Sequence, residues 1–510
     1  MKRKNTVVYL SRFVIIFLSV IAQALAAWFL LYTLQEKFLA VNVFLIFVGS
    51  VLFLSIVNRD QAAVYKLPWV ILFLAFPFAG LMVYVTFGNV KLSKKQLKKF
   101  RGFYYEHLDG YYRQPEVLSS LEGENARAAG QAKYLRSVAY LPVFDRSDTL
   151  FLPTGEEFFE CLKQELSKAK KYIFLEYFII AEGEMWDGIH EILLDKVKEG
   201  VKVYVLYDDV GSLPRVPADF YKKLNKEGIF AEKFNPFRPV VSISHNNRDH
   251  RKIAVIDGLV GFMSGVNIAD EYINVTHPHG RWRDNGVRIR GQATDNLVRL
   301  FLQLYNMSTK NPLEENDFIS SDHEDHPDGF ILPFGDAPAP INNEHVGENL
   351  YIDMIDRAER YLYIASPYFI VDTPVVQALK RAARRGVDVR IILPGVADKK
   401  IVNVMTRSFY PSLLSAGVKI YHFRGGFIHS KTVLSDGDTG VTGTINFDYR
   451  SFVHHFECAV WMYKTSSLND IYKDFCELFD NECDRIPETY SLKWYESLLK
   501  SVLNLFAPLM

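Results

Sequence analysis

The sequence is poor in cysteine and has no excess of either charge. Its 510 residues include four cysteines: Cys161, Cys458, Cys476 and Cys483. Their positions do not form a disulfide framework, so we interpret them as free structural thiols. Basic and acidic residues number 59 each. A protein that binds a nucleic-acid backbone normally has more basic than acidic residues, so this balance argues against a nucleic-acid partner.

The even charge balance hides an uneven distribution along the chain. The first 88 residues hold seven basic and two acidic residues, so the remainder holds 52 basic and 57 acidic ones. The longer part of the chain is therefore slightly acidic, which again argues against nucleic-acid binding. The total length exceeds what one hydrophobic core usually holds and predicts two or three domains.

Long apolar runs are confined to the first 88 residues. Three of them lie at about residues 13–34, 39–57 and 67–87, and each is close to the roughly 20 residues that cross a bilayer as a helix. The first run is not followed by a clear small-residue cleavage site, which argues against a signal peptide. We predict a multi-pass protein of the plasma membrane with three spans, or with two spans and an interfacial helix.

Basic clusters on both sides of these runs bear on the orientation. Four basic residues precede the first run, and six lie at residues 91–101 after the third. Three spans would place the two clusters on opposite faces, although each prefers the cytoplasm. The larger cluster and the unpaired cysteines favour a cytoplasmic catalytic part. The cluster at 91–101 is either a solvated helix face or a surface for anionic lipid headgroups.

One short pattern occurs twice in the remainder of the chain. It reads His-x-Lys-x4-Asp, with an Asn ten residues after the Asp. Its copies consist of His250, Lys252, Asp257 and Asn267 and of His429, Lys431, Asp436 and Asn446. Two copies that agree beyond the motif itself indicate a duplicated unit that builds one site.

The hydrophobic pattern around the two motifs is also repeated. Helical segments at residues 155–170 and 349–359 each lead into a short apolar strand, at 172–175 and at 361–364. Alternating helices and strands are typical of an α/β sandwich. We therefore predict the α/β class, with two duplicated halves.

Composition divides the chain into six predicted segments. They are a transmembrane region, a membrane-proximal linker, the first half, an acidic linker, the second half and a C-terminal amphipathic helix, at residues 1–88, 89–133, 134–310, 311–346, 347–486 and 487–510. The histidines of the acidic linker fit a solvated segment better than a metal site. The C-terminal helix either lies on the bilayer or packs on the catalytic part.

The paired motif predicts an anion-binding site. In each copy the His and the Lys are two residues apart, so they share one face of a strand and can point into one site. Neither copy contains Cys or further ligands at a fixed spacing, so we expect no metal and no cofactor. Two imidazoles and two ammonium groups, with the amides of Asn267 and Asn446 as substrate contacts, suit a five-coordinate phosphorus.

Two histidines can divide a transfer reaction at phosphorus. One attacks and forms a phosphohistidine, while the other protonates the departing alkoxide and later accepts a proton from the incoming alcohol. Each imidazole needs a carboxylate that fixes its tautomer, and the candidates are Asp284 and Glu457. Asp257 and Asp436 belong to the catalytic motif, but we interpret them as bracing a turn rather than acting on substrate.

The two copies resemble the HKD motifs of the phospholipase D superfamily, and the surrounding sequence resembles its bacterial cardiolipin synthases over about residues 60–510. The matching segments lie at residues 207–212, 234–238, 247–252, 282–284, 367–369, 385–390 and 505–509. The resemblance implies two phospholipase D-like α/β sandwich halves that form one catalytic unit behind N-terminal transmembrane helices. It also implies that two phosphatidylglycerol molecules of the membrane condense to cardiolipin and glycerol without a metal ion.

The resemblance and the pattern together favour His250 as nucleophile and His429 as general acid and base, with the reverse order left open by the near symmetry. One departure is His455, at a position where the relatives more often carry Asn. A phospholipase D-type hydrolase or a headgroup-exchanging phosphatidyltransferase is the alternative function. An inactive scaffold would not need both complete motifs, and the apolar runs and the acidic remainder of the chain argue against a nuclease.

Overall fold

The computed structural model describes residues 39–58, 63–75, 115–236 and 247–503, except residues 340 and 343, and a few isolated positions before residue 99. The chain divides into two units. The first comprises Met1–Val90 and Pro239–Ile243, and the second comprises Lys91–Arg238 and Ser244–Met510.

Two helices form the described part of the first unit, α2 (Leu39–Val57) and α3 (Ala63–Ala75). The Lys66 ammonium donates to the carbonyl oxygen of Val57 at 2.8 Å, where α2 ends. No helix in the described part of the chain is both long enough and apolar enough to cross a membrane. The predicted apolar run at 13–34, the end of the run at 67–87 and nearly all of the basic cluster at 91–101 lie outside the described residues.

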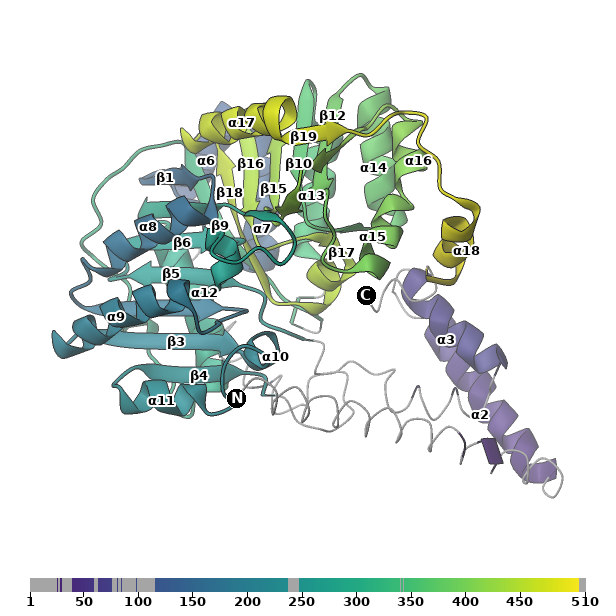
Figure 1. The fold of residues 1–510 in the computed structure, drawn as a ribbon, viewed down its shortest axis with the longest axis horizontal. Helices are drawn as coiled ribbons and strands as arrows, with labels where there is room; N and C mark the ends of the chain where they lie inside the picture. Colours follow the sequence, from purple (N-terminus) through teal and green to yellow (C-terminus); the bar gives the residue numbers. More distant parts are fainter. Residues whose placement is uncertain are drawn as a thin grey trace. The chain divides into compact units, whose positions relative to one another are not determined.

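The second unit contains two large mixed sheets (Figure 1). The first sheet has the order β1 (Ser147–Leu152), β8 (Gly286–Gly291), β6 (Val260–Ser264), β5 (Lys252–Ile256), β2 (Tyr172–Tyr177), β3 (Lys202–Asp208) and β4 (Phe230–Phe234). The second has the order β9 (Phe330–Asp336), β18 (Glu457–Tyr463), β16 (Thr439–Gly443), β15 (Thr432–Ser435), β10 (Tyr361–Ala365), β12 (Asp388–Pro394), β13 (Lys419–Phe423) and β19 (Cys483–Arg485).

The two sheets repeat one topology. The first seven strands of each order correspond one to one. In both sheets the three strands at one end of this series pair in parallel, β2–β3–β4 and β10–β12–β13. The remaining pairs are antiparallel, including β2–β5 and β10–β15, which carry the motifs. This is the duplicated α/β arrangement that the paired motif and the repeated hydrophobic pattern predict.

Helices cover both sheets. Those of the first half are α8 (Gly155–Leu166), α9 (Glu184–Lys198), α10 (Asp209–Ser212), α11 (Phe220–Lys226), η3 (Asp270–Ile273), α12 (Thr294–Ser308) and η4 (Glu315–Asp317). The second half has α13 (Val346–Arg357), α14 (Thr373–Arg384), α15 (Lys400–Arg407), α16 (Tyr410–Leu414), η5 (Arg450–His454), α17 (Ser467–Glu477), η6 (Leu478–Glu482) and α18 (Trp494–Leu503).

The strands alternate their side chains between a shared core and an outer core. Phe174 of β2 joins a central cluster with residues of α12 and α17, while Ile173 and Leu175 join an outer cluster beneath α8 and α9. In β10, Tyr363 joins the same central cluster, and its neighbours join the outer cluster of the second half. Strands buried on both faces need continuous apolar runs, which is why their sequences are easily recognised.

Two predicted linkers are partly wrong. The segment 89–133 includes α6 (Pro115–Glu124) and the start of α7 (Ala126–Ala139), whose buried residues pack in the outer core of the second half. The segment 311–346 includes the buried edge strand β9, which pairs with β18. The polar residues that surround β9 hide its short apolar run, and its Pro333 is tolerated because the strand lies at the sheet edge.

The C-terminal segment forms a helix in its described part. The helix α18 lies beside α15, and the Lys500 ammonium donates to the carbonyl oxygen of Ser408 at 3.2 Å. Residues 504–510 lie outside the described residues. The described turns of α18 therefore follow the second alternative, a helix packed on the catalytic part, although Leu499 stays 41% exposed.

Candidate active site

A short backbone pairing between the two halves places each motif histidine at their boundary. The short strand β7 (Arg281–Arg283) pairs in parallel with β14 (Gly426–Ile428), so the next residues, Asp284 and His429, lie side by side. In the other half an isolated bridge between Asp249 and Phe456 places their successors, His250 and Glu457, side by side. The backbone N–H of His250 donates to the Phe456 carbonyl at 2.9 Å, and that of His429 donates to the Arg283 carbonyl at 2.7 Å.

Each imidazole is held by a carboxylate from the opposite half. His250 Nδ1 lies 2.9 Å from both carboxylate oxygens of Glu457, and His429 Nδ1 lies 2.6 Å from Asp284 Oδ2. Both carboxylates are fully buried. The ionised Glu457 can only accept, so we assign the proton of His250 to Nδ1. His429 Nδ1 also lies 2.8 Å from the Lys431 ammonium, and we assign its proton to Nδ1 because the contact with Asp284 is the shorter one. The Nε2 atoms are thereby left available for chemistry.

The two motif lysines lie against these histidines. The Lys252 ammonium donates to the carbonyl oxygen of His250 at 2.6 Å, and the Lys431 ammonium donates to that of His429. Burial lowers the pKa of Lys252 to about 8 and that of Lys431 to about 7, because the ammonium groups lose water. The charge of Lys252 also helps to lower the pKa of both His250 and His429.

The two histidine–carboxylate pairs differ electrostatically. Burial alone would raise the pKa of Glu457, but attraction by His250 and hydrogen bonds with His250 and His455 hold it well below its usual range. Burial raises the pKa of Asp284 to about 7, against the attraction of Lys431. Burial also lowers the pKa of His250 and His429. His250 therefore has a carboxylate anion behind it, whereas Asp284 exchanges a proton near neutral pH.

The residues after the motifs explain part of this difference. Gly265 leaves room for Asp284, because a Cβ at this position would overlap its carboxylate. The equivalent residue of the second half is Thr444, whose hydroxyl donates to Glu457 Oε2. Thr444 was not among the residues predicted from the motifs. The only signal in the sequence is the contrast between a Gly and a Thr at the same distance from the two aspartates.

The two predicted asparagines differ in whether the protein already occupies their hydrogen-bonding groups. Asn267 is committed to the protein itself, since its Oδ1 accepts from the backbone N–H of Ile179 at 3.0 Å and its Nδ2 donates to the Tyr272 hydroxyl. Asn446 is 5% exposed, and its Oδ1 has no hydrogen-bond partner in the described structure. A substrate contact by Asn267 would have to be made in addition to these hydrogen bonds or in place of one of them, whereas Asn446 keeps a free polar atom.

The motif aspartates lie at the far ends of the motif strands. Asp257 follows β5 with a φ of 54°, and Asp436 follows β15 with a φ of 55°. The Asp257 carboxylate accepts three backbone N–H groups, those of Lys170, Lys171 and Tyr172. The Asp436 carboxylate accepts those of Glu359, Arg360 and Tyr361. Both aspartates thus brace the turn before a central strand, as the sequence predicts.

Removing one of these braces should lower stability rather than turnover. In Asp257→Ala three backbone donors lose their partner, so we expect the free energy of unfolding to fall by about 3 kcal/mol. The turnover of the protein that remains folded should be unchanged, because the carboxylate lies at the opposite end of β5 from His250. A thermal melt and a rate normalised to folded protein measure the two effects. Asp470→Ala, at an exposed position of α17, is the matched control.

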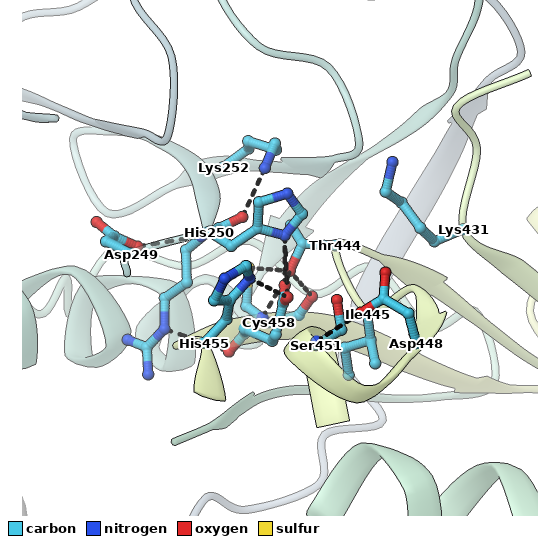
Figure 2. Close-up of polar contacts among 12 residues, drawn as sticks. Asp249, His250, Lys252, Lys431, Thr444, Ile445, Asp448, Ser451, His455 and Cys458 are labelled. Carbon is cyan, nitrogen blue, oxygen red and sulfur yellow. Dashed lines mark hydrogen bonds and ion pairs between the residues drawn. The ribbon is translucent and has the colours of Figure 1, made fainter. Parts of the chain in front are cut away.

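Aromatic and histidine side chains complete the site. Phe178 lies edge-on to the His250 ring at 5.1 Å, and Trp282 lies 5.5 Å from the His429 ring, both between ring centroids. His455 lies beside His250 and Glu457, as Figure 2 shows for the two rings. Among the described residues these last three form a group whose possible ligand atoms lie within 4.8 Å of one another. The buried Lys252 ammonium beside them makes the site better suited to an anion than to a metal ion.

Two buried imidazoles, each with its Nδ1 held by a carboxylate, and two buried lysines define a phosphoryl-transfer centre of the phospholipase D type. A family model described as the phospholipase D-like domain of cardiolipin synthase matches residues 351–481. The chain is 34% identical over 479 residues to a cardiolipin synthase of Halalkalibacterium halodurans, which covers 92% of this chain and 93% of that protein. The chain therefore belongs to the cardiolipin synthase family of the phospholipase D superfamily.

Two further proteins are similar to this chain. An uncharacterized protein of Streptococcus mutans is 40% identical over 466 residues, covering 91% of this chain and all of the relative. The crystal structure of phosphatidylserine synthase from Haemophilus influenzae superimposes with a TM-score of 0.55 at 16% identity, covering 74% of this chain and 97% of that one. At this identity the structural match shows a common fold.

Proposed function

We propose that this enzyme transfers a phosphatidyl group between two phosphatidylglycerol molecules, giving cardiolipin and glycerol. The proposal rests on one observation, that each half supplies the carboxylate that holds the motif histidine of the other half. His250 and His429 come from different halves, and each has its Nδ1 held by a carboxylate of the other half. Two imidazoles with free Nε2 atoms in one site provide a nucleophile and a proton carrier for the same phosphorus.

The reaction proceeds in two balanced steps. His250 Nε2 attacks the phosphorus of the first phosphatidylglycerol, and the bond from phosphorus to the glycerol oxygen breaks. His429, which enters this step protonated on both ring nitrogens, gives its Nε2 proton to that oxygen and keeps the Nδ1 proton beside Asp284. Free glycerol leaves, and a phosphatidyl group remains on His250. A headgroup hydroxyl of the second phosphatidylglycerol then gives its proton to His429 and attacks phosphorus. The bond from phosphorus to nitrogen breaks, and cardiolipin is released.

The electrostatic difference between the two pairs supports this assignment of roles. Phosphorylation of a neutral imidazole produces a cation, and the ionised Glu457 stabilises that cation on His250. The raised pKa of Asp284, at about 7, lets the Asp284–His429 pair take up and release a proton near neutral pH. Lys252, Lys431 and Asn446 are proposed to hold the phosphate oxygens, whose negative charge increases in the transition state.

Purified full-length protein incubated with phosphatidylglycerol in detergent micelles tests the proposed function. The expected products are cardiolipin and glycerol in equal amounts, absent with His429→Ala. His277→Ala, which changes an exposed loop histidine, is the matched control and should retain full activity. Phosphatidic acid as the main product would overturn the transfer reaction in favour of a hydrolase, and phosphatidic acid esters of added alcohols would indicate headgroup exchange.

Substrate binding should weaken as the pH rises. The phosphodiester carries its charge throughout the neutral range, but Lys431 and Lys252 lose theirs above pKa values of about 7 and about 8. KM for phosphatidylglycerol should therefore rise by about tenfold per pH unit for each lysine that must be protonated. Initial rates over a range of pH values measure this dependence. In Lys431→Met the KM should be high already at neutral pH and should vary less with pH, and an unchanged dependence would contradict the role of Lys431.

We propose that the first 88 residues attach the enzyme to the bacterial plasma membrane, with two or three spans and the catalytic part on the cytoplasmic face. The three apolar runs support this proposal, as does the exposure of Phe44 (63%) and Phe47 (65%) on α2. Single-cysteine substitutions give the measurement, for example at the exposed Asp470 of α17. In intact cells that position should be protected from a membrane-impermeant thiol reagent, and labelling from outside would reverse the orientation.

A further inference from the structure

The backbone before each motif histidine is held in a different way. In the second half, all three residues of β14 pair with β7 directly before His429. In the first half, the described residues directly before His250 belong to no strand, and they pair through one isolated bridge from Asp249 to Phe456. One bridge restrains a segment less than a paired strand does, so the position of His250 depends on further contacts.

A buried ion pair provides these contacts. Arg248 Nε donates to Asp208 Oδ2 at 2.8 Å, and Arg248 Nη2 donates to Asp208 Oδ1 at 2.8 Å. The side chains of Arg248 and Asp208 are 4% and 0% exposed. Two parallel contacts between a guanidinium and a carboxylate fix the plane of both groups, and burial makes the loss of either partner costly.

The same two side chains connect the segment before His250 to β3, β4 and α10. Asp208 is the last residue of β3, and its carboxylate also accepts two backbone N–H groups of α10, both at 2.9 Å. It accepts the Asp249 N–H at 3.1 Å as well. The guanidinium extends beyond the carboxylate, since Arg248 Nη1 donates to the carbonyl oxygen of Asn235, just after β4, at 3.0 Å. The first sheet thus determines where Arg248 and Asp249 lie.

The backbone of Arg248 transmits this position to the catalytic pair. Its carbonyl oxygen accepts the Phe456 N–H at 2.9 Å, and the His250 N–H donates to the Phe456 carbonyl at 2.9 Å. Phe456 directly precedes Glu457, the carboxylate that holds His250 Nδ1. A displacement of Arg248 would therefore change the alignment of His250 with Glu457.

The second half has no equivalent of this ion pair. The registers of β2 with β3 and of β10 with β12 make Pro394 the equivalent of Asp208. Phe427 precedes His429 by two residues, as Arg248 precedes His250. Neither Pro394 nor Phe427 carries a charge, so the ion pair acts only on the half that contains the proposed nucleophile.

We propose that Arg248, held by Asp208, is a positioning residue that keeps His250 aligned with Glu457 for attack on phosphorus. A misplacement of a reacting group by about 1 Å can cost about 100-fold in rate. The ion pair should therefore determine how fast the phosphatidyl–His250 intermediate forms. The alignment of His429, which follows a paired strand, should not depend on it. The inference rests on the proposed transfer through His250.

Arg248→Lys in the full-length enzyme tests this role. Lysine keeps a positive charge for Asp208, but a single ammonium group cannot replace the planar fork that contacts Asp208 and Asn235 together. With a radiolabelled lipid that carries a good leaving group, the rate of labelling of His250 should fall by about 10- to 100-fold. The kcat for cardiolipin formation should fall with it, and KM should stay unchanged.

The matched control is Arg299→Lys, the same change in a largely buried ion pair with Glu315. It should label His250 at the wild-type rate. Asp208→Asn keeps an oxygen for the N–H groups of α10 but removes the charge that holds Arg248, so it should reproduce the loss seen with Arg248→Lys. A circular dichroism spectrum and a thermal melt check that each variant is folded, and either Arg248→Lys or Asp208→Asn suffices for the test.

Histidine-labelled protein gives a second measurement that needs no lipid reaction. In nitrogen NMR spectra, the Nδ1–H signal of His250 should move in Arg248→Lys and that of His429 should not, and neither should move in Arg299→Lys. His250→Ala and His429→Ala assign the two signals. A simple loss of packing would disturb both histidines, so equal movement of the two signals would overturn the inference.

Wild-type labelling of His250 in folded Arg248→Lys protein would also overturn the inference, as would a rise in KM without a loss of labelling rate. If the wild type releases phosphatidic acid instead of cardiolipin, the transfer reaction fails, but the labelling rate still tests Arg248 because hydrolysis uses the same His250 intermediate. If no lipid labels the wild type, the proposed function fails and the NMR signals decide. An unmoved His250 signal in Arg248→Lys would then reject the positioning role.

Discussion

His250→Ala should abolish both cardiolipin formation and covalent labelling of the protein by radiolabelled phosphatidylglycerol. The expected loss of turnover is roughly 10⁴-fold or more, because the substitution removes the only group assigned to attack phosphorus. The structure makes this a specific expectation for His250. It is the imidazole whose carboxylate is fully ionised, and that charge stabilises the cation left by attack at phosphorus.

The companion variant His429→Ala distinguishes the two histidines. Without a proton donor the departure of glycerol is slow, but the second step is slowed as well, so any phosphatidyl group that reaches His250 stays there. We therefore expect label on His429→Ala protein after long incubation and none on His250→Ala protein. Acid-labile, base-stable label identified on a His250 peptide by mass spectrometry is the measurement. Label on His250→Ala and none on His429→Ala would exchange the two roles.

Much of the fold follows from local sequence. The apolar runs at Tyr172–Tyr177 and Tyr361–Ala365 are buried on both faces, and such strands stand out against the amphipathic helices beside them. Gly200 and Gly386 follow α9 and α14 with φ of 90° and 95°, a conformation that favours glycine and marks the helix end. By contrast, β9 is one short strand inside a polar segment, and only its pairing with β18 makes it a strand.

The residues of the site could also be predicted from the sequence, but which carboxylate lies against which histidine could not. The two motifs identify His250 and His429 in any reading of the sequence, and Asp284 and Glu457 follow as candidate carboxylates. Nothing in the spacing says that each imidazole takes its carboxylate from the opposite half. That pairing depends on two bridges between the halves, β7–β14 and Asp249–Phe456, which are contacts between distant segments.

The same limit applies to the two motif asparagines. Asn267 and Asn446 occupy equivalent positions of the two copies, yet Asn267 is bound to Tyr272 and to the backbone of Ile179. A motif gives residue types at fixed spacing and does not say which of their hydrogen-bonding groups the fold uses. The turn-bracing role of Asp257 was accessible from the sequence because it depends on the local geometry at the end of a strand.

The second large effect is expected at Glu457. Glu457→Gln keeps the size of the side chain and its contact with His250, but it removes the charge that stabilises the phosphorylated imidazole. The amide also offers a donor toward Nδ1, which favours the wrong tautomer. An equivalent change behind the histidine of a serine protease lowers turnover by about 10⁴-fold, and we expect roughly 10³- to 10⁴-fold here, seen in kcat and in the rate of labelling of His250.

Asp284→Asn is the matched comparison, and the two pairs should respond differently. Because the pKa of Asp284 is about 7, a large fraction of the enzyme already holds this group uncharged at neutral pH. Removing its charge should therefore slow turnover less than the same change at Glu457, and it should remove the part of the pH profile that titrates near pH 7.

Formation of the intermediate from a lipid with a good leaving group needs no proton from His429. With such a substrate Asp284→Asn should label His250 at nearly the wild-type rate, whereas Glu457→Gln should remain slow. Equal losses for the two variants would mean that the anion behind His250 has no special role in stabilising the intermediate.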